Sequence, residues 1–256
     1  MSSTTDTRNT IHYKMRDARS SLILKLSSIN FGSLPTESLM RLQKLEHLYL
    51  NQCSISGQPP NILTNFNNLS TLDLSSNAID YIPGDFFKEK FQELKKLDLS
   101  YNKLNSIPST INYLVNLEKL AVSNNGLIEL APQIGELRSL RMLDAGSNLI
   151  REVPGSLCAG RLARRLQHLN LSGNLLHTLP VEIGLLVKLE ELNLERNQLS
   201  YLPASVRSLV KLKAFYYGEN DWMVCPPTVH GVPTTNQASF GPLALEKIYS
   251  YIYPQM

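Results

Sequence analysis

The residues of this chain that could do catalytic or metal chemistry are few and widely separated. Its five histidines show no spacing typical of metal ligands: they are His12, His47, His168, His177 and His230. The sequence contains no phosphate-binding loop, no G-x-G-x-x-G, no H-E-x-x-H and no G-x-S-x-G motif. We therefore expect no catalytic residue, no metal ion and no cofactor, and predict that the chain is not an enzyme.

The cysteines indicate the compartment. Cys53, Cys158 and Cys225 are odd in number, and each lies more than sixty residues from the next. Such a set does not form a disulfide framework and favours a reducing compartment. The N-terminus lacks the apolar core of a secretory signal, and no stretch approaches 18 consecutive apolar residues. These observations predict a cytoplasmic protein without a membrane span, with the nucleus as the alternative location.

Composition excludes several classes of protein. The 256 residues are 43% hydrophobic and 18% charged, which excludes a disordered chain. A net charge of +3 is too small to require a nucleic acid or an anionic membrane as partner. Leucine is in large excess at 45 residues, and asparagine is frequent at 21. This bias favours one repetitive domain.

A short sequence motif repeats along the chain at nearly constant spacing. Residues 69–83, LSTLDLSSNAIDYIP, return as LKKLDLSYNKLNSIP at 94–108, and related copies start at Leu140, Leu166 and Leu189. The fourth residue of the pattern marks nine units spaced 23 to 26 residues apart: Leu24, Leu48, Leu72, Leu97, Leu120, Leu143, Leu169, Leu192 and Phe215. Nine units in phase are not coincidence.

This pattern resembles the leucine-rich repeat family, whose signature is L-x-x-L-x-L-x-x-N/C-x-L. The resemblance covers residues 21–227, about four fifths of the chain. The L-x-x-L-P endings, and the Ile-Gly-x-Leu turns at 134–137 and 183–186, are similar to the intracellular type found in Ras scaffolds and plant intracellular proteins. The resemblance implies an α/β solenoid of about nine repeats, a horseshoe with a concave parallel β-sheet and convex short helices or 3-10 turns.

The residues themselves give the same architecture. Leu72 and Leu74 lie two apart and point to one side of a short strand, whereas Asp73 points to the other. Stacked copies then form one parallel sheet over a continuous leucine core. The asparagine that recurs from Asn77 to Asn220 is expected to satisfy backbone groups in a buried turn. Residues 84–94 are expected to form a fuller helix on the convex side.

The ends of such a stack need covering. Helical spacing predicts a cap helix over residues 9–19, which gives an N-terminal tail and cap at 1–20 and a solenoid at 21–227. The C-terminal segment, 228–256, is expected to contain a capping helix over 242–252.

The concave sheet faces solvent and is the expected partner-binding surface. Its candidate binding residues are Tyr49, Asp73, Lys96, Asp98, Tyr101, Lys119, Asp144, His168, Asn193, Arg196 and Tyr216. Tyrosine and arginine most often dominate binding energy, whereas for the aspartates the solvated consensus residue of the repeat is the favoured interpretation. The convex arginines 161, 164 and 165 fit a phosphate or an acidic partner, but a solvated face is the favoured interpretation.

Three functions remain open. The leading hypothesis is a monomeric, non-catalytic scaffold that binds another protein, and no nucleic acid, on its concave face. The second is a substrate receptor of a ubiquitin ligase, because residues 242–252 weakly resemble a helix that docks an adaptor. The third, regulation of a phosphatase or small GTPase, depends on family analogy alone.

Overall fold

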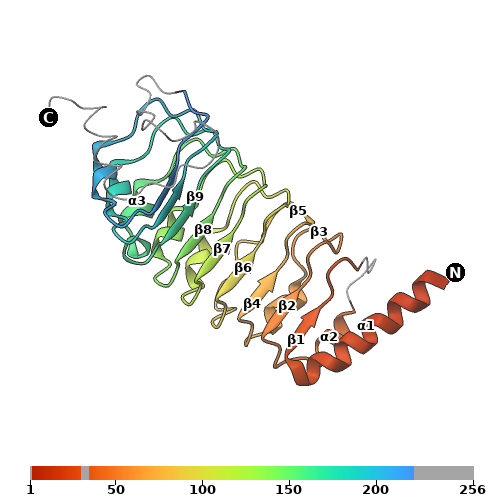
Figure 1. The fold of residues 1–256 in the computed structure, drawn as a ribbon. Helices are drawn as coiled ribbons and strands as arrows, with labels where there is room; N and C mark the ends of the chain where they lie inside the picture. The colour runs from red at the N-terminus through yellow and green to blue at the C-terminus, as the bar shows by residue number, and fades with distance from the viewer. Residues whose placement is uncertain (1, 30–34, 222–256) are drawn as a thin grey trace.

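The computed structural model describes the backbone of residues 2–29 and 35–221, and the side chains of these ranges from Asn9 onward. The chain forms a curved stack in which each repeat contributes one strand to a single parallel sheet (Figure 1). The strands, in order across the sheet, are β1 Ile23–Lys25, β2 His47–Tyr49, β4 Thr71–Asp73, β6 Lys96–Asp98, β7 Lys119–Ala121, β8 Met142–Asp144, β9 His168–Asn170, β10 Glu191–Asn193 and β11 Ala214–Tyr216.

The register of the sheet confirms the repeat phase. Leu24 pairs with Leu48, Leu48 with Leu72, and the remaining marker residues follow in the same way as far as Phe215. Each marker is the middle residue of its strand and is no more than 2% exposed. The leucine-rich repeat solenoid expected from the sequence is therefore the fold.

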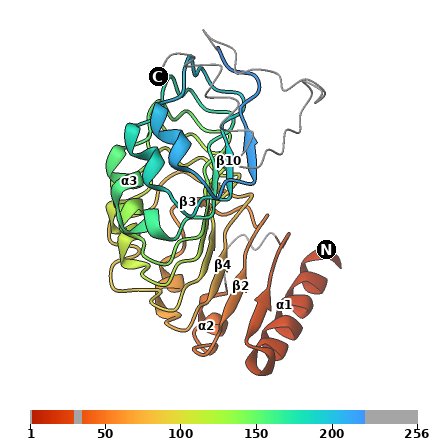
Figure 2. The same ribbon diagram turned by 60° about the vertical axis from the view of Figure 1, so that its left-hand side comes forward.

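Short helices lie on the side of the stack opposite the sheet (Figure 2). They are α2 Thr36–Leu39, η1 Asn61–Asn65, η2 Ser109–Tyr113, η3 Pro132–Glu136, α3 Gly155–Ala159, η4 Arg161–Arg164, η5 Val181–Leu185 and η6 Ala204–Ser208, and all the η elements are 3-10 helices. A small second sheet pairs β3 Ser56–Gly57 with β5 Ala78–Ile79. Pro108, Pro180 and Pro203 each stand just before a helix, where a fixed φ guides the chain into the first turn.

The fuller helix expected over residues 84–94 is wrong. The segment forms successive turns, and Glu89 and Phe91 have φ of 56° and 55°, a left-handed conformation that a right-handed helix cannot contain. Phe86, Phe87 and Phe91 instead pack as an aromatic cluster with ring centroids 5.2 to 6.3 Å apart. The three rings are buried, in a repeat whose convex side has no helix in the described structure.

The asparagine column forms the expected ladder. In the fourth repeat, Asn102 accepts a hydrogen bond from the Ile79 N–H of the preceding repeat and donates to the carbonyls of Leu74, Leu99 and Ser100. The same arrangement recurs at the other six asparagines from Asn77 to Asn220. In the second repeat Cys53 replaces asparagine, and its thiol donates to the Leu26 carbonyl at 3.1 Å.

Glycine in the Ile-Gly-x-Leu turns permits neighbouring convex helices to approach closely. A Cβ at Gly184 would lie 2.3 Å from the carbonyl oxygen of Ser205, and one at Gly135 would lie 2.7 Å from that of Ser156. The recurring glycine is thus a packing requirement of the stack.

The N-terminal helix is longer than the expected 9–19. Helix α1, Ser2–Ser21, lies beside β1 at the end of the sheet (Figure 1), and its Met15 and Ala18 are buried in the core cluster. The expected capping helix over 242–252 lies outside the described residues, so the division at 1–20, 21–227 and 228–256 stays a prediction.

Candidate functional site

Three columns of side chains face the inside of the curve. The first residue of each strand forms one column and contains Lys96, Lys119 and His168. The third residue of each strand forms the next and contains Tyr49, Asp73, Asp98, Asp144, Asn193 and Tyr216. Tyr101 and Arg196 lie in the turn that follows the strand. The structure thus places all the candidate residues on the concave side, in three separate rows.

The turn row has a shared backbone conformation that the sequence reasoning missed. Every residue that precedes a ladder position has a positive φ, between 53° and 63°: Ser28, Gln52, Ser76, Tyr101, Asn124, Ser147, Gly173, Arg196 and Glu219. A non-glycine residue in this region costs about 1–2 kcal/mol. Since all nine repeats have this conformation, and eight of them adopt it with a non-glycine residue, it belongs to the turn of the solenoid. The abundance of serine, asparagine and glycine in this row was the available signal.

The aspartates and asparagines of the strand row cap the turn. Asp73 accepts from the Ser75 N–H at 2.9 Å, Asp98 from the Ser100 N–H at 2.9 Å, and Asn193 from the Glu195 N–H at 3.0 Å. Asp144 and Asn170 accept in the same way. Each side chain thus satisfies a backbone donor two residues further on, a structural task that is independent of any partner.

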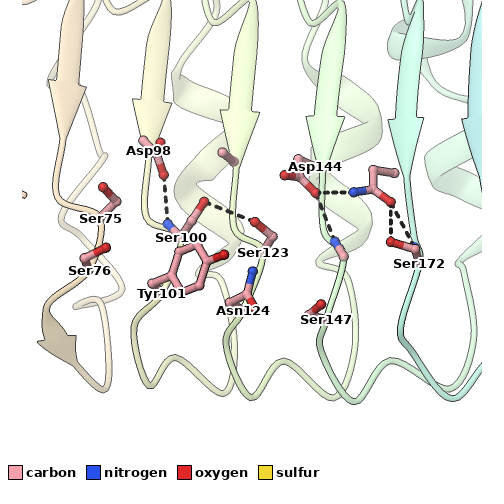
Figure 3. Close-up of a pocket in the computed structure, with 13 residues that line it drawn as sticks. Ser75, Ser76, Asp98, Ser100, Tyr101, Ser123, Asn124, Asp144, Ser147 and Ser172 are labelled. Carbon is pink, nitrogen blue, oxygen red and sulfur yellow. Dashed lines mark hydrogen bonds between the residues drawn. The ribbon is translucent and has the colours of Figure 1, made fainter. Parts of the chain in front are cut away.

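The strand row is interrupted at Ala121 of β7, and a hollow that this residue lines lies there; Figure 3 shows the hollow. It has a volume of about 430 Å³ and extends over β6 to β9. Asp98 and Asp144 stand on either side of Ala121, and Ser100 and Ser123 lie below, where the Ser123 hydroxyl donates to that of Ser100 at 3.3 Å. The hollow was not predicted from the sequence, although an alanine in a row of aspartates and asparagines was visible there.

A glycine widens the hollow on one side. A Cβ at Gly146 would lie 2.9 Å from Nδ2 of Asn170, which donates to Asp144 at 2.9 Å. The other repeats have serine, asparagine, glutamate or glycine at this position. Because Gly146 has no Cβ, it leaves room for the hydrogen bond between Asn170 and Asp144 and for a group of a binding partner above that bond.

The acidic side of the hollow is partly desolvated. Burial raises the pKa of Asp98, and the charges of Asp73 and Asp144 raise it further, against the hydrogen bonds from Ser100. A hydrogen-bond donor from outside would stabilise this carboxylate because it would replace lost solvation. The hollow can therefore accept hydrogen bonds from a partner at the Asp98 carboxylate. Its serine hydroxyls can both donate hydrogen bonds to a partner and accept them.

Several of the candidate anchors already have partners within the chain. Arg196 donates through Nε to both carboxylate oxygens of Glu219 at 3.2 Å, and His168 lies 3.0 Å from Glu191. Lys25 lies over the ring of Tyr49, 5.6 Å from its centroid. Tyr101 is 59% exposed and borders the hollow, which makes it the most available aromatic anchor of the candidate set.

Residues suited to catalysis are not brought together in the part of the chain that the structure describes. No group of three His, Cys, Asp or Glu residues within it could hold a metal ion. Burial raises the pKa of the Cys53 thiol, and it raises the pKa of Cys158 to about 12. These two thiols are therefore protonated at neutral pH and poor nucleophiles. The exposed arginines 161, 164 and 165 lie on or next to η4, outside the three concave rows.

Comparison with known proteins gives consistent matches. A leucine-rich repeat model matches residues 67–127 and 138–199, and a second one matches residues 44–66, together more than half of the chain. Proteins with such repeats generally mediate protein–protein interactions. The chain is 33% identical over 187 residues to Toll-like receptor 7 of Drosophila melanogaster, which covers 65% of this chain and 13% of the receptor. It is 32% identical over 157 residues to the adenylate cyclase of Schizosaccharomyces pombe, covering 60% and 9% respectively. The chain thus spans only about a tenth of these relatives.

Solved structures agree with the fold. A leucine-rich repeat protein of Leptospira interrogans aligns with a TM-score of 0.75 and 29% identity, over 84% of this chain and 59% of that one. A plant peptide hormone receptor in complex with RGF2 aligns with a TM-score of 0.64 and 26% identity, over 77% of this chain and 32% of that one. Among the described residues, no helix combines the length and apolar character needed to cross a membrane.

Proposed function

Because the chain belongs to the leucine-rich repeat family, we propose that it is a non-catalytic scaffold that binds another protein on its concave sheet. The observation that carries the proposal is the hollow over β6 to β9, where Ala121 and Gly146 interrupt two rows of larger side chains and Tyr101 stands exposed at the border. An exposed aromatic ring beside an unfilled, polar hollow is the arrangement of an interface anchor.

The chemistry of the hollow suits a polypeptide. Serine hydroxyls both donate and accept hydrogen bonds, and the carboxylates of Asp98 and Asp144 accept them. A peptide backbone presents both kinds of group. Nine strands at about 4.8 Å span roughly 38 Å, which is long enough for a standard protein interface. The complex of the similar plant hormone receptor supports a peptide or protein partner for this fold.

We further propose a monomer of the intracellular repeat type in the cytoplasm or nucleus. The L-x-x-L-P endings support the type, and the free, buried Cys53 and Cys158 fit a reducing compartment. The narrower hypotheses, a ubiquitin-ligase substrate receptor and a regulator of a phosphatase or small GTPase, stay predictions. The helix that the first one requires lies outside the described residues.

Affinity purification from cells with variants of the full chain tests the proposal. Tyr101→Ala removes the anchor, and Ala121→Arg fills the hollow; each should reduce partner recovery strongly, since loss of an interface anchor costs about 2 kcal/mol or more, roughly thirtyfold in affinity. Tyr201→Ala is the matched control, because Tyr201 is 53% exposed but lies outside the concave rows. Loss of partners with Tyr201→Ala and retention with Tyr101→Ala would place the binding surface elsewhere.

A further inference from the structure

Two lysines of like charge stand side by side on the concave sheet. Lys96 of β6 and Lys119 of β7 are direct partners in the parallel register, and both are exposed. Neighbouring strands lie about 4.8 Å apart, so the two stems rise next to each other. Like charges directly opposite each other destabilise a sheet.

Two other pairs of charged residues on this surface combine groups of opposite charge. In the same row, His168 lies 3.0 Å from Glu191, and at the adjoining strand edge Lys213 donates to Glu190 at 2.6 Å. Neither Lys96 nor Lys119 has an ion pair or a side-chain hydrogen bond in the part of the chain that the structure describes. The ammonium groups of this pair are therefore available to a ligand.

The surroundings make the edge positive. Lys95 and Arg141 occupy the position just before strands β6 and β8, and Glu118 lies between them, just before β7. The row that contains Lys96 and Lys119 continues on either side with the neutral residues Thr71 and Met142. We call Lys95, Lys96, Lys119 and Arg141 the basic edge. The acids Asp98 and Asp144 lie one row further along the strands. At about 3.3 Å per residue, Asp98 is roughly 7 Å from Lys96, and Asp144, one strand of about 4.8 Å further over, is roughly 8 Å from Lys119.

We propose that the basic edge binds an acidic side chain of an extended segment in the protein partner, with the aspartate or glutamate carboxylate bridging Lys96 and Lys119. A carboxylate has two oxygens and can accept charge-assisted hydrogen bonds from both ammonium groups. The backbone N–H groups of the same segment then face Asp98 and the serines of the hollow. This inference rests on the proposed function and specifies the chemistry of the partner.

A nucleic acid fits this surface less well. Its phosphates repeat along the whole strand and need a continuous basic track, whereas the row beside the basic edge contains Asp73, Asp98 and Asp144. A polypeptide can place one carboxylate over the lysines and neutral donors over the aspartates. Charge complementarity across both rows therefore favours an acidic peptide.

Fluorescence anisotropy with defined probes tests the inference on the full chain. The probes are a labelled peptide of alternating glutamate and serine, the matching glutamine–serine peptide, and a single-stranded oligothymidylate of equal charge. We expect the glutamate peptide to bind at least tenfold more tightly than the other two. Lys96→Gln/Lys119→Gln should weaken that binding about tenfold or more and leave the melting temperature within about 2 °C, as expected of exposed substitutions.

The matched control is Lys188→Gln/Lys211→Gln. These lysines also occupy equivalent positions of neighbouring repeats and are exposed, but they lie in the turns before β10 and β11. The control should change binding less than twofold. Equal losses in the two double variants, absence of glutamate-peptide binding at low salt, or tighter binding of the oligothymidylate would each overturn the inference. If Tyr101→Ala still abolishes recovery of a cellular partner in such a case, the proposed function stands and only the acidic specificity fails.

Discussion

Replacement of Asn148 should destabilise the whole stack, because this side chain joins its own repeat to the preceding one and is only 5% exposed. Its Oδ1 accepts from the Leu127 N–H at 3.1 Å, and its Nδ2 donates to the carbonyls of Val122, Ala145 and Gly146 at 3.0 to 3.1 Å. Asn148→Ala removes all four hydrogen bonds and adds no atom that could clash.

The size of the destabilisation depends on which backbone groups are left without any hydrogen-bond partner. The three carbonyls each keep a second donor: Asn125 Nδ2, Asn174 Nδ2 and Asn124 N–H. The Leu127 N–H loses the acceptor at Asn148, and a buried, unsatisfied donor costs about 1–3 kcal/mol. With the loss of the bonds to the carbonyls, we expect a total of about 2–3 kcal/mol. For a domain of this size that lowers the melting temperature by roughly 5–10 °C.

Thermal and urea unfolding monitored by circular dichroism measure the effect. Asn105→Ala is the control, since Asn105 is exposed in a loop outside the ladder, and it should change stability by no more than about 0.5 kcal/mol. Asn148→Asp keeps the acceptor for Leu127 but turns a carboxylate oxygen toward three carbonyl oxygens, so it should be less stable than Asn148→Ala at neutral pH. An Asn148→Ala protein as stable as the Asn105→Ala control would refute the ladder argument.

Three further predictions concern packing and charge. Gly184→Ala should cost about 1–3 kcal/mol in urea unfolding, because its Cβ would lie 2.3 Å from a backbone oxygen, whereas Gly84→Ala meets nothing within 4 Å and should be nearly neutral; equal midpoints would contradict this packing argument. Asp98 has a folded-state pKa raised above its ordinary value, so its contribution to stability is greatest below the unfolded pKa and is lost as the pH rises through the folded one. Asp98→Asn should therefore have a higher melting temperature than wild type at neutral pH, and this difference should become smaller on acidification. A lower melting temperature of the variant at neutral pH would show that the carboxylate is needed for stability. Leu143→Ala should cost about 2–5 kcal/mol by calorimetry because the side chain is fully buried, while Asp144→Ala should lose only about 1 kcal/mol with its two hydrogen bonds; similar losses would contradict the assigned strand phase.

The repeat phase was predictable because it depends on residue type and spacing alone. Leucines two apart on a strand must share a face, and nine copies determine the register without any knowledge of loop geometry. The asparagine ladder followed for the same reason, since a buried turn needs an amide that can both donate and accept. Even Cys53 behaves as a substitute, through its hydrogen bond to Leu26.

Features that depend on three-dimensional packing were not predictable in this way. Residues 84–94 have the phenylalanine spacing of a helical face, yet burial of Phe86, Phe87 and Phe91 outweighs that helical pattern, and two residues adopt positive φ. The hollow at Ala121 needs the positions of side chains from four strands before its volume exists. Side-chain pairing also required the structure, because Arg196 reads as a free anchor in sequence and is bonded to Glu219 in space.

A repeat protein supplies its own standard of comparison, because each position has nine copies in one chain. A feature that recurs through the copies serves the solenoid: the left-handed turn is present in all nine repeats and the ladder asparagine in seven, whatever the partner. A residue that departs from its row, with no gain to the fold, needs another explanation. Ala121 departs from a row rich in aspartate and asparagine, Tyr101 places a large ring in a row of mostly small or polar residues, and Lys96 and Lys119 oppose each other without a counterion in the described structure. These four departures fall in two neighbouring repeats, and that coincidence identifies β6 and β7 as the centre of the proposed interface.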